Sequence, residues 1–218
     1  MPTTPTSLVT LTDPRSPMAE AYRTLRTNLL FSSLDRPLAT LLVTSPAPEE
    51  GKSTTLANLA VTLAQGGRPT ILVDCDLRRP RLHEIFGVPA EPGLSNALLA
   101  KVDEPPLAAT GVENLSLLPA GAVPPSPADL LGSRRMEALI ATLKSRADFV
   151  LFDAPPVIAV TDAALLASKL DGVLLVVSAG HTRRDDAQRA KDLLEKIHVH
   201  LVGAVLTNAA VDRRLTAY

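Results

Sequence analysis

The stretch Leu41-Leu-Val-Thr-Ser-Pro-Ala-Pro-Glu-Glu-Gly-Lys-Ser-Thr54 carries the strongest structural signal in this chain. It joins a short apolar run to a loop that ends in Gly-Lys-Ser, and a helical pattern follows over residues 53–64. A strand, such a loop and a helix in this order are the context of a phosphate-binding loop. The first glycine of the usual pattern G-x-x-x-x-G-K-[ST] is replaced by Pro46, so the motif alone has moderate specificity.

The residue types in this loop suit the binding of a nucleotide. Backbone N–H groups at a helix N-terminus attract phosphate oxygens, an ammonium group reaches the β and γ phosphates, and a hydroxyl ligates Mg²⁺. The residues expected to bind nucleotide are Pro48, Glu49, Glu50, Gly51, Lys52, Ser53 and Thr54, with Ser53 also on the metal. The alternative is that Ser53 or Thr54 only caps a helix while Lys52 is solvated.

Aspartates stand at the ends of two other apolar runs. Residues 70–74 end in Asp74, and Asp76 follows at i+2, so we expect both carboxylates on one side of the strand, facing the nucleotide. The run Phe149–Asp153 ends in Asp153. Phosphoryl transfer needs one carboxylate for the metal and another for the proton of an incoming hydroxyl. Any one of these acids could belong to a solvated turn, whereas three of them after a phosphate-binding loop indicate a site.

The remaining patterns predict a single-domain α/β P-loop NTPase. Strands alternating with helices form a mostly parallel sheet with helices on both faces, and ligands bind beyond the carboxyl ends of its strands. The length of 218 residues suits one hydrophobic core. Residues 89–127 are rich in proline and weakly periodic, so we expect mainly connecting surface there. Further strands are predicted at 115–118, 172–177 and 201–206, and further helices at 134–144, 162–169 and 183–197.

The two ends of the chain are expected to flank this domain. Residues 1–16 are rich in Thr, Pro and Ser and have no period, which predicts a flexible arm. Residues 17–33 repeat apolar side chains at helical spacing, which predicts an amphipathic helix ahead of the core. The domain should therefore span residues 17–210, followed by a tail over residues 211–218.

Composition argues against several classes of function. The 22 basic and 23 acidic side chains nearly cancel and only 3% of the residues are aromatic, so no nucleic-acid partner is expected. No apolar run reaches the roughly 18 residues that cross a bilayer, so direct membrane insertion is not expected. The single cysteine, Cys75, cannot form an internal disulfide, and the expected compartment is the cytoplasm. His198 and His200 have no Cys or acidic cluster beside them, which argues against zinc.

In their order along the chain, these motifs resemble those of the bacterial tyrosine kinases of capsule and exopolysaccharide synthesis, or BY-kinases, a branch of the deviant-Walker P-loop ATPases. The resemblance covers nearly the whole chain. It implies a protein-tyrosine kinase that uses ATP and Mg²⁺, phosphorylates itself or other proteins, and regulates polysaccharide synthesis and export. The matching segments are residues 20–28, the phosphate-binding loop, and residues 74–80, 118–131 and 153–163.

The resemblance also implies roles for individual residues. It makes Asp74 the base toward a tyrosine hydroxyl, while Asp76 and Asp153 organise the metal together with the loop. Lys52 is expected to be essential for catalysis, and Asn208 is expected to contact adenine. These roles come from the family and not from the spacing of the residues.

The helix of residues 17–33 matches the family's E-x-x-R-x-x-R helix at Glu20, Arg23 and Arg26. The resemblance implies that these three residues join subunits into a ring. It also implies a transmembrane regulator of polysaccharide chain length, which recruits the kinase to the inner face of the membrane and activates it. The alternative for the three residues is an exposed helix face with ion pairs at i,i+3 spacing.

Two features depart from the family pattern. Glu49 stands where the family's loop usually has glycine, which places a negative charge near the phosphates. Family members usually end in a cluster of tyrosines, whereas this chain ends in the single Tyr218. An extended chain from Asn208 to Tyr218 spans at most about 33 to 36 Å, enough to make Tyr218 a candidate phosphoacceptor at a neighbouring subunit.

Two other functions remain open at this point. One is an ATP-driven switch that dimerises or binds partners without kinase activity, as in the related positioning ATPases. Against it, the loop before Gly51 contains no lysine, where those relatives carry their signature residue. The other is a non-catalytic scaffold that binds nucleotide and the export machinery.

Overall fold

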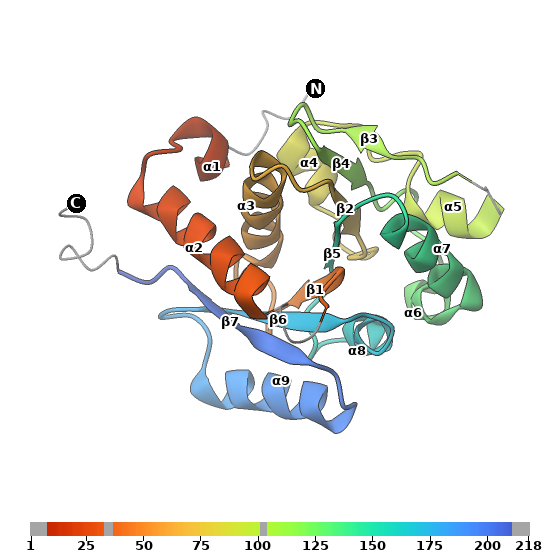
Figure 1. The fold of residues 1–218 in the computed structure, drawn as a ribbon. Coiled ribbons are helices and arrows are strands. Elements are labelled where there is room, and N and C mark those ends of the chain that lie inside the picture. Colours follow the sequence, from red (N-terminus) through yellow and green to blue (C-terminus); the bar gives the residue numbers. More distant parts are fainter. Residues whose placement is uncertain (1–7, 33–36, 101–103, 211–218) are drawn as a thin grey trace.

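A seven-stranded β-sheet forms the middle layer of the structure, a computed structural model that describes residues 8–32, 37–100 and 104–210 (Figure 1). The strand order is β3-β4-β2-β5-β1-β6-β7, and every neighbouring pair is parallel except β3 with β4. The mostly parallel sheet is therefore confirmed. Its strands are β1 (Thr40–Thr44), β2 (Thr70–Asp74), β3 (Ala108–Ala109), β4 (Leu115–Leu118), β5 (Phe149–Asp153), β6 (Gly172–Ser178) and β7 (Leu201–Thr207).

Both faces of the sheet are apolar. Successive residues of a strand point to opposite faces, so Leu42 of β1 joins one hydrophobic cluster while Leu41 and Val43 join the other. On β5, Phe152 lies in the cluster of Leu42 and Leu151 lies in the opposite one. Burial on both faces explains why these strands read in the sequence as continuous apolar runs.

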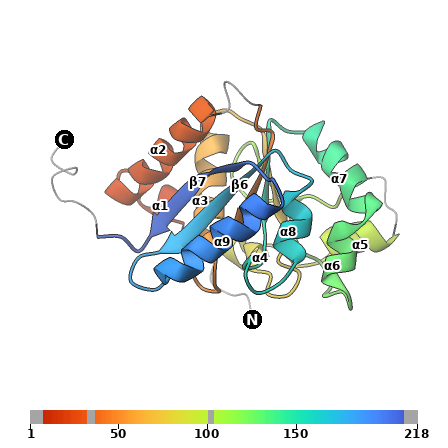
Figure 2. The same ribbon diagram turned by 90° about the horizontal axis from the view of Figure 1, so that it is seen from below.

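Helices cover both faces, as predicted. In Figures 1 and 2, α9 lies on the opposite side of β6 and β7 from α2 and α3. The helices of one face are α1 (Val9–Thr12), α2 (Pro17–Ser32), α3 (Lys52–Gln65) and α4 (Leu82–Phe86). Those of the other face are α5 (Leu94–Ala100), α6 (Pro127–Gly132), α7 (Arg134–Lys144), α8 (Asp162–Ala167) and α9 (Arg184–Lys196).

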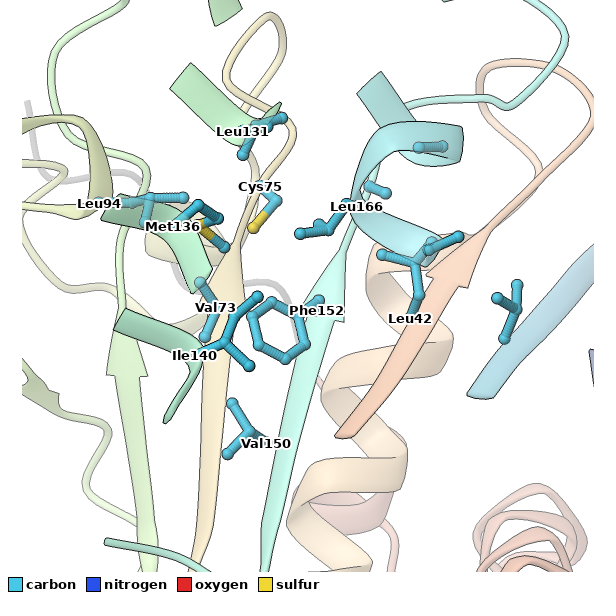
Figure 3. Packing of buried hydrophobic residues seen from close by; sticks show 14 of the residues in the cluster. Leu42, Val73, Cys75, Leu94, Leu131, Met136, Ile140, Val150, Phe152 and Leu166 are labelled. Carbon is cyan, nitrogen blue, oxygen red and sulfur yellow. The ribbon is translucent and has the colours of Figure 1, made fainter. Parts of the chain in front are cut away.

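The cluster beneath α7 shows how these helices attach (Figure 3). Met136 and Ile140 of α7 pack toward Val73 of β2 and Phe152 of β5. Cys75 belongs to the same cluster and is fully buried. Burial, followed by the charge of the nearby carboxylates, raises the pKa of its thiol well above the ordinary value, so Cys75 is a packing residue, as predicted.

The predicted boundaries agree with the structure to within one or two residues. The strands predicted from residue 41 and over 172–177 and 201–206 each gain one residue, and the helix predicted over 183–197 loses one at each end. Within the described parts of the chain, no helix combines the length and the apolar character needed to span a bilayer.

The prediction for the N-terminal arm is wrong over the part that the structure describes. Residues 9–12 form α1, and Thr10 is buried. The N and Oγ1 atoms of Thr10 both donate to Oδ1 of Asn58 on α3, at 3.1 and 2.8 Å. This segment is therefore held by tertiary contacts with α3, which leave no periodic pattern in so short a helix. Residues 1–7 and the predicted tail over residues 211–218 lie outside the described residues.

The prediction of connecting surface over residues 89–127 is also wrong in part. Residues 94–100 form α5, whose Leu94 and Leu98 are buried in the core. The N–H of Gly93 donates to Oδ1 of Asn96 at 3.0 Å, which closes the first turn. A Cβ at Gly93 would lie 2.3 Å from the backbone N of Gly121, so two segments of this region approach backbone to backbone. A helix of two turns is too short for its period to stand out among prolines.

Candidate active site

The phosphate-binding loop runs from β1 to the first residue of α3. Gly51 precedes the helix with φ = 85°, in the left-handed region that favours glycine, and a Cβ there would touch Thr207 at 3.5 Å. Glu49 also has a positive φ, 63°, which is uncommon for a residue other than glycine. The backbone of this chain thus keeps, at Glu49, a conformation that glycine adopts without strain.

Glu50 stabilises the loop through hydrogen bonds within the protein. Its side chain is fully buried and accepts hydrogen bonds from N of Ala47 at 3.0 Å and from Oγ1 of Thr182 at 2.5 Å. Its carbonyl oxygen accepts one from Oγ1 of Thr207 at 2.9 Å. Glu50 is the one residue between positions 48 and 54 that does not line the adjoining cavity. The sequence prediction grouped it with the nucleotide contacts, but its side chain shapes the loop because both oxygens are engaged within the protein.

A cavity of about 700 Å³ opens beside the loop. Three segments line it together with Ile85 of α4: the loop with the start of α3, the turn after β2, and the turn after β5. All three follow the carboxyl ends of neighbouring strands, where a parallel sheet binds its ligands. The lining residues are Pro48, Glu49, Gly51, Lys52, Ser53 and Thr54 of the first segment, Asp76, Arg78, Arg79 and Arg81 of the second, Pro155, Pro156, Ala159 and Val160 of the third, and Ile85 of α4.

Lys52, Ser53, Asp76 and Asp153 form one buried polar cluster at this cavity. Nζ of Lys52 donates to Oδ2 of Asp76 at 2.9 Å and to Oδ1 of Asp153 at 3.1 Å. Oγ of Ser53 donates to Oδ2 of Asp153 at 2.5 Å. The side chain of Asp153 is fully buried, and those of Lys52 and Asp76 are 10% and 6% exposed. The expected meeting of the loop with the acidic strand ends is thus present in the structure.

The charges of this cluster shift the pKa values of its members. Burial by itself lowers the pKa of Lys52, but the charges of Asp153 and Asp76 outweigh burial and raise the pKa to about 12. Burial raises the pKa of Asp153, and Lys52 and Ser53 counteract part of that rise. Lys52 therefore stays protonated at all physiological pH values, as a cation between two carboxylates.

Asp74 differs from Asp76 in its surroundings. It is fully buried and does not line the cavity. Its Oδ2 accepts hydrogen bonds from the backbone N of Arg81 at 3.1 Å and of Leu82 at 3.0 Å, and Oδ1 accepts one from N of Asp76 at 3.3 Å. Burial first, and then the charge of Asp153, raise its pKa to about 7.

The prediction that both aspartates face the nucleotide is therefore wrong for Asp74. Strand alternation holds only up to Asp74, where β2 ends. Beyond it the chain turns, and N of Arg79 donates to the carbonyl oxygen of Asp76 at 3.2 Å. The i,i+2 spacing consequently does not place the two carboxylates side by side.

The donor atoms present fit a nucleotide-bound Mg²⁺ ion. The described residues contain no group of three His, Cys, Asp or Glu side chains that could hold a metal by themselves. Mg²⁺ is usually bound through one or two carboxylates, with phosphates and waters as the other ligands. The hydroxyl of Ser53 and the carboxylates of Asp153 and Asp76 supply such a partial set of oxygen atoms, and the ammonium group of Lys52 already lies between the two carboxylates.

Asn208 lies beside the loop but outside the lining of the cavity. It directly follows β7 with φ = 54°, and its Nδ2 donates to Oγ of Ser178 at the end of β6, at 2.8 Å. The preceding residue, Thr207, donates to the carbonyl oxygen of Glu50, and a Cβ added at Gly51 would touch its side chain. Sequence reasoning missed Thr207 and Thr182 as supports of the loop, since a lone threonine at a strand end or turn carries no signal.

The three residues predicted to join subunits also make contacts within the chain. Arg23 pairs with Glu20 and donates to the carbonyl oxygen of Pro14. Nη1 of Arg26 donates to the carbonyl oxygen of Thr62 near the end of α3, at 2.9 Å. The candidate phosphoacceptor Tyr218 lies outside the described residues.

The loop between β1 and α3, together with Asp76 after β2 and Asp153 at the end of β5, defines the class of P-loop NTPases. The family model ParA, described as an NUBPL iron-transfer P-loop NTPase, matches residues 39–211. The chain is 40% identical over 208 residues to the tyrosine-protein kinase YwqD of Bacillus subtilis (strain 168), which covers 95% of this chain and 88% of YwqD. Within the P-loop NTPases, the chain therefore belongs to the bacterial tyrosine kinase family.

Solved structures agree with this assignment. The chimerical protein CapA2B2 superposes with a TM-score of 0.88 at 38% identity, covering 91% of this chain and 88% of that chain. The kinase domain of the Escherichia coli tyrosine kinase ETK superposes with a TM-score of 0.88 at 30% identity, covering 95% of this chain and 84% of that chain. The predicted family and fold class are both confirmed.

Proposed function

We propose that this protein is a protein-tyrosine kinase that uses MgATP and regulates capsule or exopolysaccharide synthesis and export. The observation that carries the proposal is the buried cluster of Lys52, Ser53, Asp76 and Asp153 at the cavity, in a chain of the bacterial tyrosine kinase family. It joins a cation for phosphate to oxygen ligands for a metal, and phosphoryl transfer relies on these two elements.

The phosphate-binding loop would hold the triphosphate. Phosphate oxygens compete with Asp76 and Asp153 for the ammonium group of Lys52, while the N–H groups at the start of α3 point toward the ligand. Ser53, Asp76 and Asp153 would hold Mg²⁺, which would neutralise negative charge on the phosphates. Asn208 is proposed to contact adenine, since it stands at the end of β7 next to Thr207, which contacts the loop.

In the transfer step, the tyrosine Oη forms a bond to the γ phosphorus while the bond from that phosphorus to the bridging β–γ oxygen breaks and ADP leaves. The phenolic proton must go to a base. We propose Asp74, because a pKa of about 7 suits a base at neutral pH. A water molecule or a shift of residues 75–81 has to connect the hydroxyl with Asp74, which does not line the cavity.

Oligomer formation and a membrane partner are also part of the proposal. Glu20, Arg23 and Arg26 are proposed to join subunits into a ring, with α2 as the contact helix. Glu20 is 65% exposed in its ion pair, and the neighbouring Met18 is 55% exposed. A transmembrane regulator of polysaccharide chain length is proposed to recruit the protein from the cytoplasm to the inner face of the membrane, as the family resemblance implies.

The test is to incubate the purified protein with MgATP and a segment of a candidate membrane activator, and to map phosphate by mass spectrometry. We expect phosphotyrosine in the wild type and its loss in Lys52→Met and Ser53→Ala. In Tyr218→Phe we expect the chain itself to lose its phosphotyrosine, because the one other tyrosine, Tyr22, is mostly buried. Ser53→Ala is included because it keeps the charges of the cluster. Free phosphate without phosphotyrosine would instead support the ATP-driven switch, and the absence of both products would support the scaffold.

A further inference from the structure

A second ion pair connects the two turns that line the cavity. Asp162, the first residue of α8, is fully buried. Its Oδ2 accepts a hydrogen bond from Nε of Arg78 at 2.9 Å, and its Oδ1 accepts one from Nη2 of the same residue at 3.1 Å. Arg78 belongs to the turn after β2, whereas Asp162 follows the turn after β5. The pair thus joins two walls of the cavity through contacts between residues 84 positions apart.

The two hydrogen bonds fix the plane of the guanidinium group. A guanidinium has five N–H donors in a rigid arrangement, and Asp162 engages only Nε and one hydrogen of Nη2. In the described part of the chain, no other acceptor bonds to this group. The side chain of Arg78 is 42% exposed and lines the cavity, so its remaining donors are available to a ligand.

The two neighbouring arginines are not held in this way. Nε of Arg81 pairs with Oε2 of Glu84 at 2.9 Å, but both side chains are largely exposed, at 61% and 38%. The side chain of Arg79 makes no ion pair with the described residues. Among the three arginines of this turn, Arg78 is therefore the one whose orientation a buried carboxylate determines.

The charges in the cavity explain why an oriented cation is needed there. Two carboxylates, Asp76 and Asp153, share the single charge of Lys52, so this cluster as a whole is negative. A γ-phosphoryl group in transfer carries charge on three oxygens, and donors aimed at those oxygens stabilise the transition state. Arg78 lies near enough to Asp76 that the charge of Asp76 contributes to a raised pKa of the guanidinium, after the larger effect of Asp162. Arg78 is thus a cation close to the cluster but on the other turn.

We propose that Asp162 is a positioning residue that holds Arg78 as an oriented donor for the γ-phosphoryl group of the nucleotide. The proposal rests on the proposed function for its role in transfer, but the binding of ATP in preference to ADP does not depend on transfer. A purely structural ion pair between two turns is the competing explanation. The two differ in one measurable property: only a ligand-directed donor distinguishes a nucleotide with a γ-phosphate from one without.

The test measures the affinity of the purified protein for MgADP and for a magnesium complex of a non-hydrolysable ATP analogue, by calorimetry. Arg78→Lys keeps the charge opposite Asp162 but lacks the planar fork, and Asp162→Asn keeps the shape of the side chain but lacks its charge. Arg68→Gln is the matched control, because it breaks an exposed Arg–Asp pair, with Asp148 at 3.2 Å, away from the cavity. Thermal unfolding of each variant shows whether it is folded.

We expect Arg78→Lys to bind the ATP analogue about tenfold more weakly or worse, with MgADP affinity changed less than about twofold. Asp162→Asn should also lower the ratio of the affinity for the ATP analogue to the affinity for MgADP, and Arg68→Gln should leave this ratio unchanged. If Arg78→Lys lowers only thermal stability and leaves the ratio intact, the pair is structural and the proposal is wrong. An effect confined to the KM of an acidic tyrosine peptide would also overturn it, since the anion would then belong to the acceptor.

This design separates the inference from the proposed function. If the wild type prefers the ATP analogue and loses that preference in Arg78→Lys but forms no phosphotyrosine, kinase activity fails and the role of Arg78 stands. If phosphotyrosine forms at the same rate in the wild type, Arg78→Lys and Asp162→Asn, the role of Arg78 fails and kinase activity stands.

Discussion

Replacing Lys52 with methionine should do more than remove a phosphate ligand. In the folded protein, the ammonium group of Lys52 lies between the carboxylates of Asp76 and Asp153, with Asp74 buried nearby. Lys52→Met leaves these buried acids without their cation. We therefore expect the variant to be destabilised as well as inactive, which matters because such a variant is an obvious choice for an inactive control.

The size of the effect follows from the charges. A rise of the pKa of Lys52 from the ordinary 10.5 to about 12 corresponds to roughly 2 kcal/mol at neutral pH, on the scale of ~1.4 kcal/mol per pKa unit. This contribution is fully present below pH 10.5 and is lost as the pH rises through 12. Breaking one partner of a buried ion pair typically costs about 3–5 kcal/mol. We expect Lys52→Met to lose roughly 2–5 kcal/mol of unfolding free energy at pH 8.

The loss should be smaller at pH 6 than at pH 8. The pKa of Asp74 is raised from 3.8 to about 7, so its protonated form is favoured by folding. Such a group stabilises the fold at low pH, and that stabilisation disappears as the pH rises through the folded pKa. Without Lys52, which lowers the pKa of both Asp74 and Asp153, these values rise further and the pH dependence steepens.

Urea unfolding followed by circular dichroism at pH 6 and pH 8 provides the measurement. Lys144→Met is the matched control, since it breaks the more exposed pair of Lys144 with Asp171 at 3.3 Å, for which a change of about 1 kcal/mol or less is expected. If Lys52→Met proved as stable as Lys144→Met, and equally so at both pH values, the electrostatic reasoning about the cluster would be refuted.

Three further predictions concern the loop and the helices beside it. Glu49→Gly removes a side chain at φ = 63° and a negative charge at the cavity, so MgADP should bind several-fold more tightly in calorimetry, and unchanged or weaker binding would contradict this. Arg26→Ala removes the hydrogen bond to the carbonyl oxygen of Thr62 and should lower the free energy of unfolding in urea by about 1–2 kcal/mol. Arg23→Ala breaks an exposed ion pair and should lower it by less than about 1 kcal/mol. Equal losses would show that the hydrogen bond of Arg26 to the end of α3 does not stabilise the fold. Thr207→Val leaves the carbonyl oxygen of Glu50 without its 2.9 Å hydrogen bond. Nucleotide affinity should fall by about fivefold while the melting temperature changes little. A lower melting temperature with normal nucleotide affinity would show that Thr207 only stabilises the fold.

The sequence predicts best those features that local patterns determine. Buried strands such as Phe149–Asp153 are continuous apolar runs, because both of their faces are covered, and their ends are marked by Asp or Gly. Lys52 and Ser53 were identified because the loop and the helix that follows are adjacent in sequence. The structure confirms that this loop meets Asp76 and Asp153.

Features that depend on contacts between distant residues were not predicted. Helix α1 is held by the hydrogen bonds of Thr10 to Asn58, 48 residues away, and no pattern within residues 8–16 predicts it. The ion pair of Arg78 with Asp162 was not predicted for the same reason, because an arginine close to Arg79 and Arg81 is typical of a solvated turn. Asp74 was placed toward the ligand by strand alternation, which stops applying where β2 ends.

The register of β5 explains how the site is assembled from separate segments. In the sheet, Asp153 is paired with Val43 of β1 on one side and with Asp74 of β2 on the other. The loop that leaves β1 brings Ser53 to Asp153, and the turn that leaves β2 brings Asp76 to Lys52. A slip of β5 by one residue would turn Asp153 to the opposite face of the sheet and separate it from both turns. Because both faces of β5 are apolar, side-chain size opposes that slip: it would exchange Phe152 and Leu151 between two closely packed clusters, so core packing determines the geometry of the polar cluster.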